Sequence, residues 1–178
     1  SSAEFVPKGL VPYSTQFTVT VNAGLEALDG AKLKEAYTFS FTTPRHEQQD
    51  TDPARGVRWL KPDQTVALLF NQPVAQADLL KFVHLVTADN SAGVPFTIEK
   101  EVNIEEERRA QLEEQRKKSG GSSRSYDAMS DEDRGYRNKQ TRYVLKAKTA
   151  LPLKTEVTVK LDAALHGKEG PLEMVAIN

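Results

Sequence analysis

Strict alternation of large apolar and small polar residues is the feature that most limits how this chain can fold. In residues 16–21, Phe17, Val19 and Val21 alternate with polar residues, and in residues 37–43 three aromatic residues alternate with hydroxyl residues. A period of two, built from aromatic and β-branched residues, is typical of a half-buried β-strand. Asp29-Gly30 lies between the two segments and suits a tight turn. The pattern predicts two strands joined by a turn.

Further segments of strand character follow, at residues 65–70, 82–87, 94–98, 143–145 and 156–161. Residues 65–70 are apolar on both faces, which predicts a central strand covered on two sides. The strand should end at Asn71-Gln72-Pro73, since proline cannot donate to a β-ladder. Together these segments predict an all-β chain folded as an antiparallel β-sandwich.

Two polar stretches interrupt the strands. Residues 44–56 contain Pro44, Pro53 and Gly56 and little apolar surface, so we interpret them as a linker. Residues 100–140 are predicted to form a charged helical insertion.

The insertion has a clear start signal, because Asn103 with Glu106 matches a capping box. The helix is predicted over residues 104–118 and should be solvated, since few of its residues are apolar. Three pairs at i,i+4 favour it: Glu105 with Arg109, Glu113 with Lys117, and Glu114 with Lys118. A Gly/Ser-rich connection at residues 119–125 and a second short helix starting at residues 130–133 are expected to follow.

The chain also matches itself when shifted by 140 residues. A first set of positions falls on a second set of identical residues: Pro12, Thr15, Thr18, Val19, Ala23, Leu25 and Gly30 on Pro152, Thr155, Thr158, Val159, Ala163, Leu165 and Gly170. We therefore expect residues 1–43 to be the C-terminal part of one sandwich, whose first half lies upstream. Residues 57–178 then form most of the next sandwich, with the insertion at residues 100–140.

Composition excludes several classes of protein. The 178 residues include no cysteine, which removes disulfides, thiolate nucleophiles and thioester chemistry from this segment. The formal net charge of −1 gives no field that favours nucleic acid. No apolar run is long enough to span a membrane directly. Residues 1–4 lack a signal-peptide pattern, so either a leader was removed or, as the repeat favours, the chain is an internal fragment.

The sequence contains no catalytic, cofactor-binding or metal-binding constellation that we would assign. His46, His84 and His166 are widely spaced and are expected at the surface or in loops. Residues 167–170 lack the Walker spacing and predict a turn, and the basic residues of 108–118 are interleaved with glutamates. Trp59 is expected in the core or at an edge. The chain is predicted to be a non-enzyme with no cofactor.

Residues 5–43 resemble the end of bacterial Ig-like domains. The matching run is Pro12, Thr15, Phe17, Val19, Val21, Leu25, Leu28, Asp29, Gly30, Leu33 and residues 39–43. Phe17 replaces the tyrosine of that pattern. The second stretch is similar to the N-terminal region of bacterial alpha-2-macroglobulins, carried by Trp59, Leu68, residues 70–74, Leu165 and residues 170–172.

The resemblance implies Ig-like and macroglobulin-like sandwiches in a large periplasmic or cell-surface protein that traps proteases. In that family a protease cuts a bait region, and a thioester can then capture it. The partners would be other domains of the same protein and, through the whole protein, proteases. The alternative is an Ig-like spacer module of a surface-layer protein or adhesin. A bait role for residues 100–140 is a further hypothesis; polar insertions of this kind are usually only solvated.

Overall fold

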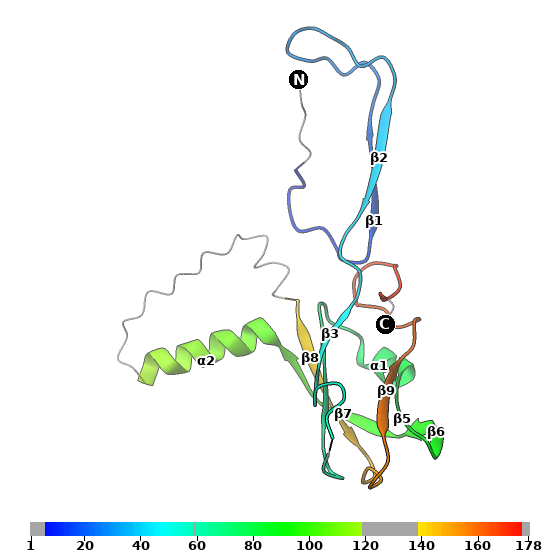
Figure 1. The fold of residues 1–178 in the computed structure, drawn as a ribbon. Helices are drawn as coiled ribbons and strands as arrows, with labels where there is room; N and C mark the ends of the chain where they lie inside the picture. Colours follow the sequence, from blue (N-terminus) through cyan, green and yellow to red (C-terminus); the bar gives the residue numbers. More distant parts are fainter. Residues whose placement is uncertain (1–5, 59, 119–138, 176–178) are drawn as a thin grey trace.

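The computed structural model describes residues 6–58, 60–118 and 139–175, and all its sheets are antiparallel. Figure 1 shows a β-hairpin standing on a β-rich body, with one long helix projecting from the side of the body. The predicted Gly/Ser-rich connection, the second short helix and Trp59 lie outside the described residues.

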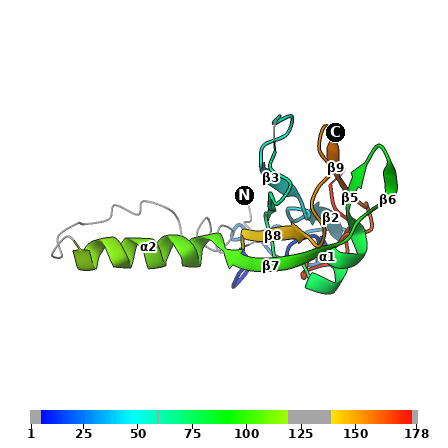
Figure 2. The same ribbon diagram turned by 90° about the horizontal axis from the view of Figure 1, so that it is seen from below.

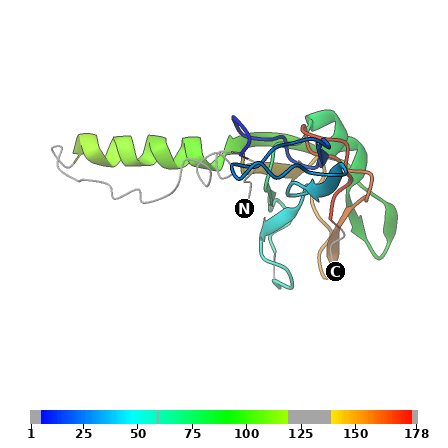
Figure 3. The same cartoon turned by 90° about the horizontal axis from the view of Figure 1, so that it is seen from above.

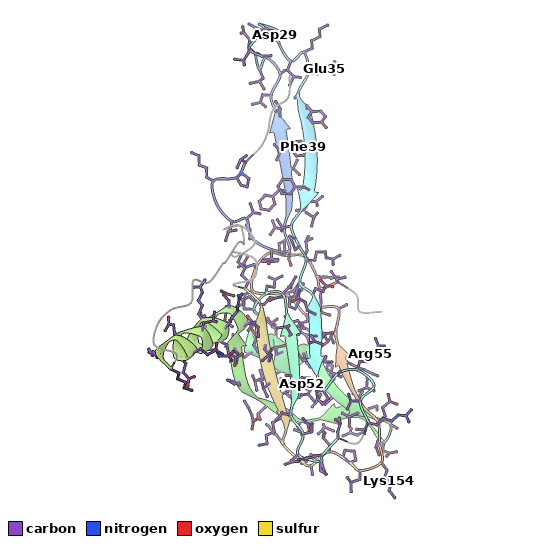
Figure 4. The ribbon with its side chains drawn as sticks, turned by 60° about the vertical axis from the view of Figure 1, so that its left-hand side comes forward. Asp29, Glu35, Phe39, Asp52, Arg55 and Lys154 are labelled. Atoms are coloured by element: carbon purple, nitrogen blue, oxygen red, sulfur yellow. The ribbon has the colours of Figure 1, made fainter. Side chains whose placement is uncertain are left out.

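The hairpin consists of β1 (Gln16–Val21) and β2 (Tyr37–Thr42). Val19 lies opposite Phe39, so the apolar residues of both strands share one face. The threonine and serine hydroxyls share the other face, where Thr18 and Ser40 are hydrogen-bonded at 3.0 Å. The two predicted strands and the Asp29-Gly30 turn are confirmed, with Gly30 at a φ of 79°. Asp29 lies at the far tip of the hairpin (Figure 4).

Two sheets form the body. The larger sheet has the order β3-β4-β8-β7, from β3 (Gln48–Asp52), β4 (Val66–Phe70), β8 (Thr141–Ala147) and β7 (Phe96–Asn103). The smaller sheet has the order β6-β5-β9, from β6 (Asn90–Val94), β5 (Val83–Thr87) and β9 (Val157–Leu161). This mostly β, antiparallel arrangement is consistent with the predicted β-sandwich.

One apolar core joins the two sheets. Leu68 and Tyr143 come from the larger sheet, and Leu85 comes from the smaller one; each is at most 1% exposed. Alternate residues of β4 are buried, which places their side chains on the core face. The prediction that residues 65–70 form a central strand is confirmed, because β4 pairs with β3 on one edge and β8 on the other.

A short helix, α1 (Gln76–Phe82), precedes β5 and was not predicted. The helix has 7 residues, of which Leu79 is buried. So short a segment shows no helical periodicity in the sequence. The hydroxyl of Tyr143 fastens the segment before α1, since it donates to the Val74 carbonyl oxygen at 2.8 Å and accepts from the Val74 N–H at 2.8 Å.

The linker interpretation of residues 44–56 is wrong for its central part, because β3 pairs there with β4. The sequence Gln-Gln-Asp-Thr-Asp carries no apolar pattern. Its backbone still completes the ladder at the sheet edge, where polar side chains are tolerated. The single strand predicted at residues 94–98 is also wrong, because Pro95 separates two strands, β6 and β7. Proline has no N–H group to donate to a β-ladder.

The long helix α2 (Ile104–Lys118) has the predicted bounds. Asn103 Oδ1 caps it, accepting from the N–H groups of Glu105 and Glu106 at 3.0 and 3.1 Å. Two of the predicted pairs form, Glu105 with Arg109 and Glu114 with Lys118. Figures 2 and 3 show α2 extending away from both sheets, so its outer turns have no support from the body.

Candidate functional site: a buried polar junction

The strongest concentration of buried polar side chains lies where the hairpin joins the body. Ser14 and Thr43 flank the base of the hairpin and are 0% and 5% exposed. The Ser14 N–H donates to the Pro44 carbonyl at 2.9 Å. This hydrogen bond continues the pairing of the two segments beyond the ends of β1 and β2. Ser14 has a φ of 51°, a left-handed conformation that is uncommon for a residue with a side chain.

The Ser14 hydroxyl oxygen is the centre of this junction. It accepts a hydrogen bond from the backbone N–H of His46 at 2.9 Å and one from Gln72 Nε2 at 3.0 Å. His46 precedes β3 and Gln72 follows β4, so one oxygen connects the hairpin base to two segments of the larger sheet. Both donors are buried, and among the described residues each would lose its hydrogen-bond acceptor if the hydroxyl were removed.

The loop after β9 closes the junction from the other side. The Leu172 N–H donates to the Ser14 carbonyl at 3.0 Å, and the Tyr13 N–H donates to Glu169 Oε2 at 3.1 Å. Lys139 forms an ion pair with Glu169 at 2.8 Å and lies 4.9 Å from the centre of the Tyr13 ring. The base of the hairpin is therefore held by residues more than a hundred positions away in the sequence.

Glycine is required at position 170 of that loop. Gly170 has a φ of 69°, and a Cβ there would collide with the carbonyl oxygens of Tyr13 and Ser14. The turn predicted at residues 167–170 thus has a packing role, because its backbone must approach the hairpin base closely. Arg45 adds a further link, donating from Nε to the Glu173 carbonyl at 2.9 Å.

His46 lies in the loop between β2 and β3, as one of the two expected placements had it, but it is 0% exposed and so is not a surface residue. Its ring stacks on Phe70 with 4.9 Å between the ring centres. Neither ring nitrogen has a hydrogen-bond partner among the described residues. Burial, together with a smaller electrostatic contribution from His166, lowers the pKa of His46 to about 4. His46 is therefore neutral at pH 7 and contributes packing to the junction.

The other histidines lie in different surroundings. His166 is half-buried in the loop after β9 and acts electrostatically on His46, so the fold brings together two histidines that the sequence separates widely. His84 is exposed on β5. Within the described ranges, no three His, Asp or Glu side chains gather in a way that could hold a metal ion. None of the helices described is long and apolar enough to cross a membrane.

A second feature is a hollow of about 260 Å³ beside β5 and β6, lined mainly by apolar residues, with His84 and Gly93 among them. His84 is its one ionisable lining residue, so it brings together no nucleophile and base and does not define a chemical site. The buried junction is the more informative site, because its residues fix one part of the chain against another. No protein-family model, curated protein or solved structure matches this chain.

Proposed function

We propose that this chain is a non-catalytic scaffold segment of a large extracytoplasmic protein, in which the end of one Ig-like sandwich is rigidly joined to the next. Residues 1–43 supply the end of the first sandwich, and residues 57–178 supply the macroglobulin-like second sandwich with its insertion at residues 100–140. The resemblance to bacterial alpha-2-macroglobulins makes protease trapping the activity of the whole protein.

The order of strands in the body supports the Ig-like part of the proposal. Immunoglobulin-type sandwiches place strands A, B, E and D in one sheet and C and F, with G, in the other. The larger sheet follows that order if β3, β4, β8 and β7 are A, B, E and D. In the smaller sheet β5 and β9 then correspond to C and F, and β6 is an additional strand beside C. On this assignment α2 lies in the connection between D and E.

The single observation that carries the scaffold proposal is the junction around Ser14. Flexible linkers between domains leave few contacts across the boundary. Here Ser14, Tyr13 and Arg45 make direct hydrogen bonds to distant parts of the body. A protein that must transmit a shape change from one domain to the next needs a connection of this stiffness, as a protease trap does.

Protease uptake by the whole protein tests the proposed activity. The parent protein is incubated with trypsin and separated by size-exclusion chromatography. We expect trypsin to co-elute with the parent and to keep its activity on small peptide substrates. Its activity on large protein substrates should be lost, because an enclosing protein excludes bulky molecules. Trypsin that elutes free, with full activity on proteins, would contradict protease trapping.

The spacer module is the second candidate, and the end-to-end arrangement of hairpin and body favours it (Figure 1). A row of such units would make a stiff rod. Small-angle scattering of the parent separates the two functions. A spacer keeps the same elongated profile after limited cleavage by trypsin, whereas a trap becomes more compact when it is cut and encloses the protease.

A further inference from the structure

The internal repeat extends to details of backbone conformation. Among non-glycine residues described, Ser14 and Lys154 have positive φ angles, 51° and 58°, and they occupy equivalent positions of the two copies. The next residues also agree, since the Thr15 hydroxyl donates to the Tyr13 carbonyl and the Thr155 hydroxyl donates to the Leu153 carbonyl. β1 and β9 are therefore the same strand of two related units.

The neighbours of these two strands differ. β1 pairs with β2, the strand that follows it in the chain. β9 pairs with β5, which precedes it, and within the described residues its other edge pairs with nothing. Because β5 occupies one edge of β9, the opposite edge is the one where a strand equivalent to β2 fits. This is also the place of strand G in the immunoglobulin order.

The burial of β9 fits an edge that no described strand covers. Its core-facing residues Val157, Val159 and Leu161 are only partly buried, although they pack against the core. In the adjacent strand, Val83 and Leu85 are 1% exposed. Side chains on a strand are covered partly by the neighbours on either side of it. A further strand beside β9 would cover the exposed parts of these three side chains.

We infer that the outer edge of β9 is an acceptor site for one extended peptide strand, which binds antiparallel and has the residue pattern of β2. Large aromatic residues at every second position would face the core, and small hydroxyl residues would face outward. The register follows from the hairpin. Val19 lies opposite Phe39 and Thr18 lies opposite Ser40. In the same register, Val159 receives an aromatic residue and Thr158 a serine.

The chemistry of the outer face supports this pattern. On the hairpin, the hydroxyls of Thr18 and Ser40 are 3.0 Å apart and those of Thr20 and Thr38 are 3.1 Å apart. β9 carries Thr158 and Lys160 at the positions equivalent to Thr18 and Thr20, and both are exposed. A serine opposite Thr158 can therefore repeat the hydroxyl pair. The inference rests on the repeat and on the strand order, and it is independent of protease trapping.

Disulfide trapping provides a sharp test, because the chain contains no cysteine of its own. Two full-length variants, Thr158→Cys and Lys160→Cys, are mixed with two peptides that carry the sequence of residues 37–43 and two added lysines for solubility. One peptide has cysteine in place of Ser40, and the other has it in place of Thr38. In the inferred register, each variant has one directly opposed peptide and one that is displaced along the strand. Directly opposed Cβ atoms lie about 5 Å apart and displaced ones about 7–8 Å.

We expect the Thr158→Cys variant to prefer the Ser40 peptide and the Lys160→Cys variant to prefer the Thr38 peptide, each by roughly tenfold in disulfide yield. Equal yields in all four combinations, or a preference for the displaced pairs, would overturn the proposed register and site.

A second measurement uses the unmodified chain and a peptide without cysteine. Binding should protect the β9 amides that face away from β5 from hydrogen exchange by about tenfold or more. It should also raise the Tm by roughly 4 °C or more at saturating peptide. Unchanged exchange along β9 refutes the acceptor site. A dimer of the chain that persists with peptide present would show that a second copy occupies the edge, and would equally overturn the proposal.

Discussion

The Ser14 hydroxyl and the His46 backbone N–H, joined at 2.9 Å, connect the base of the hairpin to the edge of the larger sheet. The same hydroxyl accepts from Gln72 at 3.0 Å. Ser14, His46 and Gln72 are all buried, so both hydrogen bonds of the junction depend on one hydroxyl oxygen that is shielded from solvent.

Replacing Ser14 by alanine should destabilise the body by about 2–3 kcal/mol, because two buried donors lose their acceptor. Urea denaturation measures the change. Ser40→Ala is the matched control, since it also removes a serine hydroxyl that is hydrogen-bonded, but at an exposed position. The control should lose less than about 0.5 kcal/mol. Equal losses of unfolding free energy in the two variants would show that the buried hydrogen bonds of Ser14 stabilise the protein no more than an exposed one does.

The stability of the chain should depend on pH through His46. The folded-state pKa is lowered to about 4 from 6.5, so the unfolded chain binds the proton first as the pH falls. Stability from this group is complete above about pH 6.5 and is lost progressively between about pH 6.5 and pH 4. The total loss is on the order of 3 kcal/mol.

Denaturation of the wild type and of His46→Phe at several pH values measures this effect. Phenylalanine keeps a flat ring against Phe70 and cannot be protonated, so the difference between the two proteins should grow as the pH falls from 6.5 to 4. His84→Phe changes an exposed histidine and should leave the profile as in the wild type. A His46→Phe profile parallel to that of the wild type would refute the assignment.

Replacing Tyr143 by phenylalanine should cost about 2–3 kcal/mol, since the N–H and carbonyl of Val74 both lose their side-chain partner in the core. Burial also raises the pKa of Tyr143 far above its usual value, so the hydroxyl stays protonated and keeps donating to Val74. Thermal unfolding gives the measurement. Tyr37→Phe, on the exposed hairpin, is the control and should change the Tm little.

Limited digestion with trypsin should cut α2 before any strand. Arg108, Arg109, Lys117 and Lys118 are exposed on a helix that extends beyond the body, where opening a turn breaks few contacts. Mass spectrometry identifies the first fragments. First cuts at Lys146 or Lys160, within the sheets, would contradict this expectation.

A chain in which residues 105–136 are replaced by a short glycine bridge should still unfold cooperatively. The strands that flank this segment, β7 and β8, pair with each other through residues 96–103 and 141–147. Loop-closure entropy changes only slowly with loop length, so the pairing does not require the segment. Chemical denaturation followed by circular dichroism tests this. A broad, non-cooperative transition would mean that the segment belongs to the folding unit.

The sequence alone determined the elements whose residue pattern repeats with the period of the structure. β1, β2, β4, β9 and α2 follow directly from alternation, apolar runs or a capping box, because those signals depend on neighbours in the chain. The relation between β1 and β9 could also be read from the aligned residues. No such local signal exists for β3, whose polar residues become a strand only because β4 offers its backbone groups.

The tertiary structure decided the junction and left one edge of β9 without a neighbour among the described strands. The burial of His46 could not be predicted from its neighbours Arg45 and Glu47, since it involves packing against Phe70 of β4. The roles of Ser14 and Gly170 likewise come from packing between segments more than a hundred residues apart. The local residue pattern determines which face of a strand is apolar. The segments that cover this face are determined by long-range packing, which exists only in the folded chain.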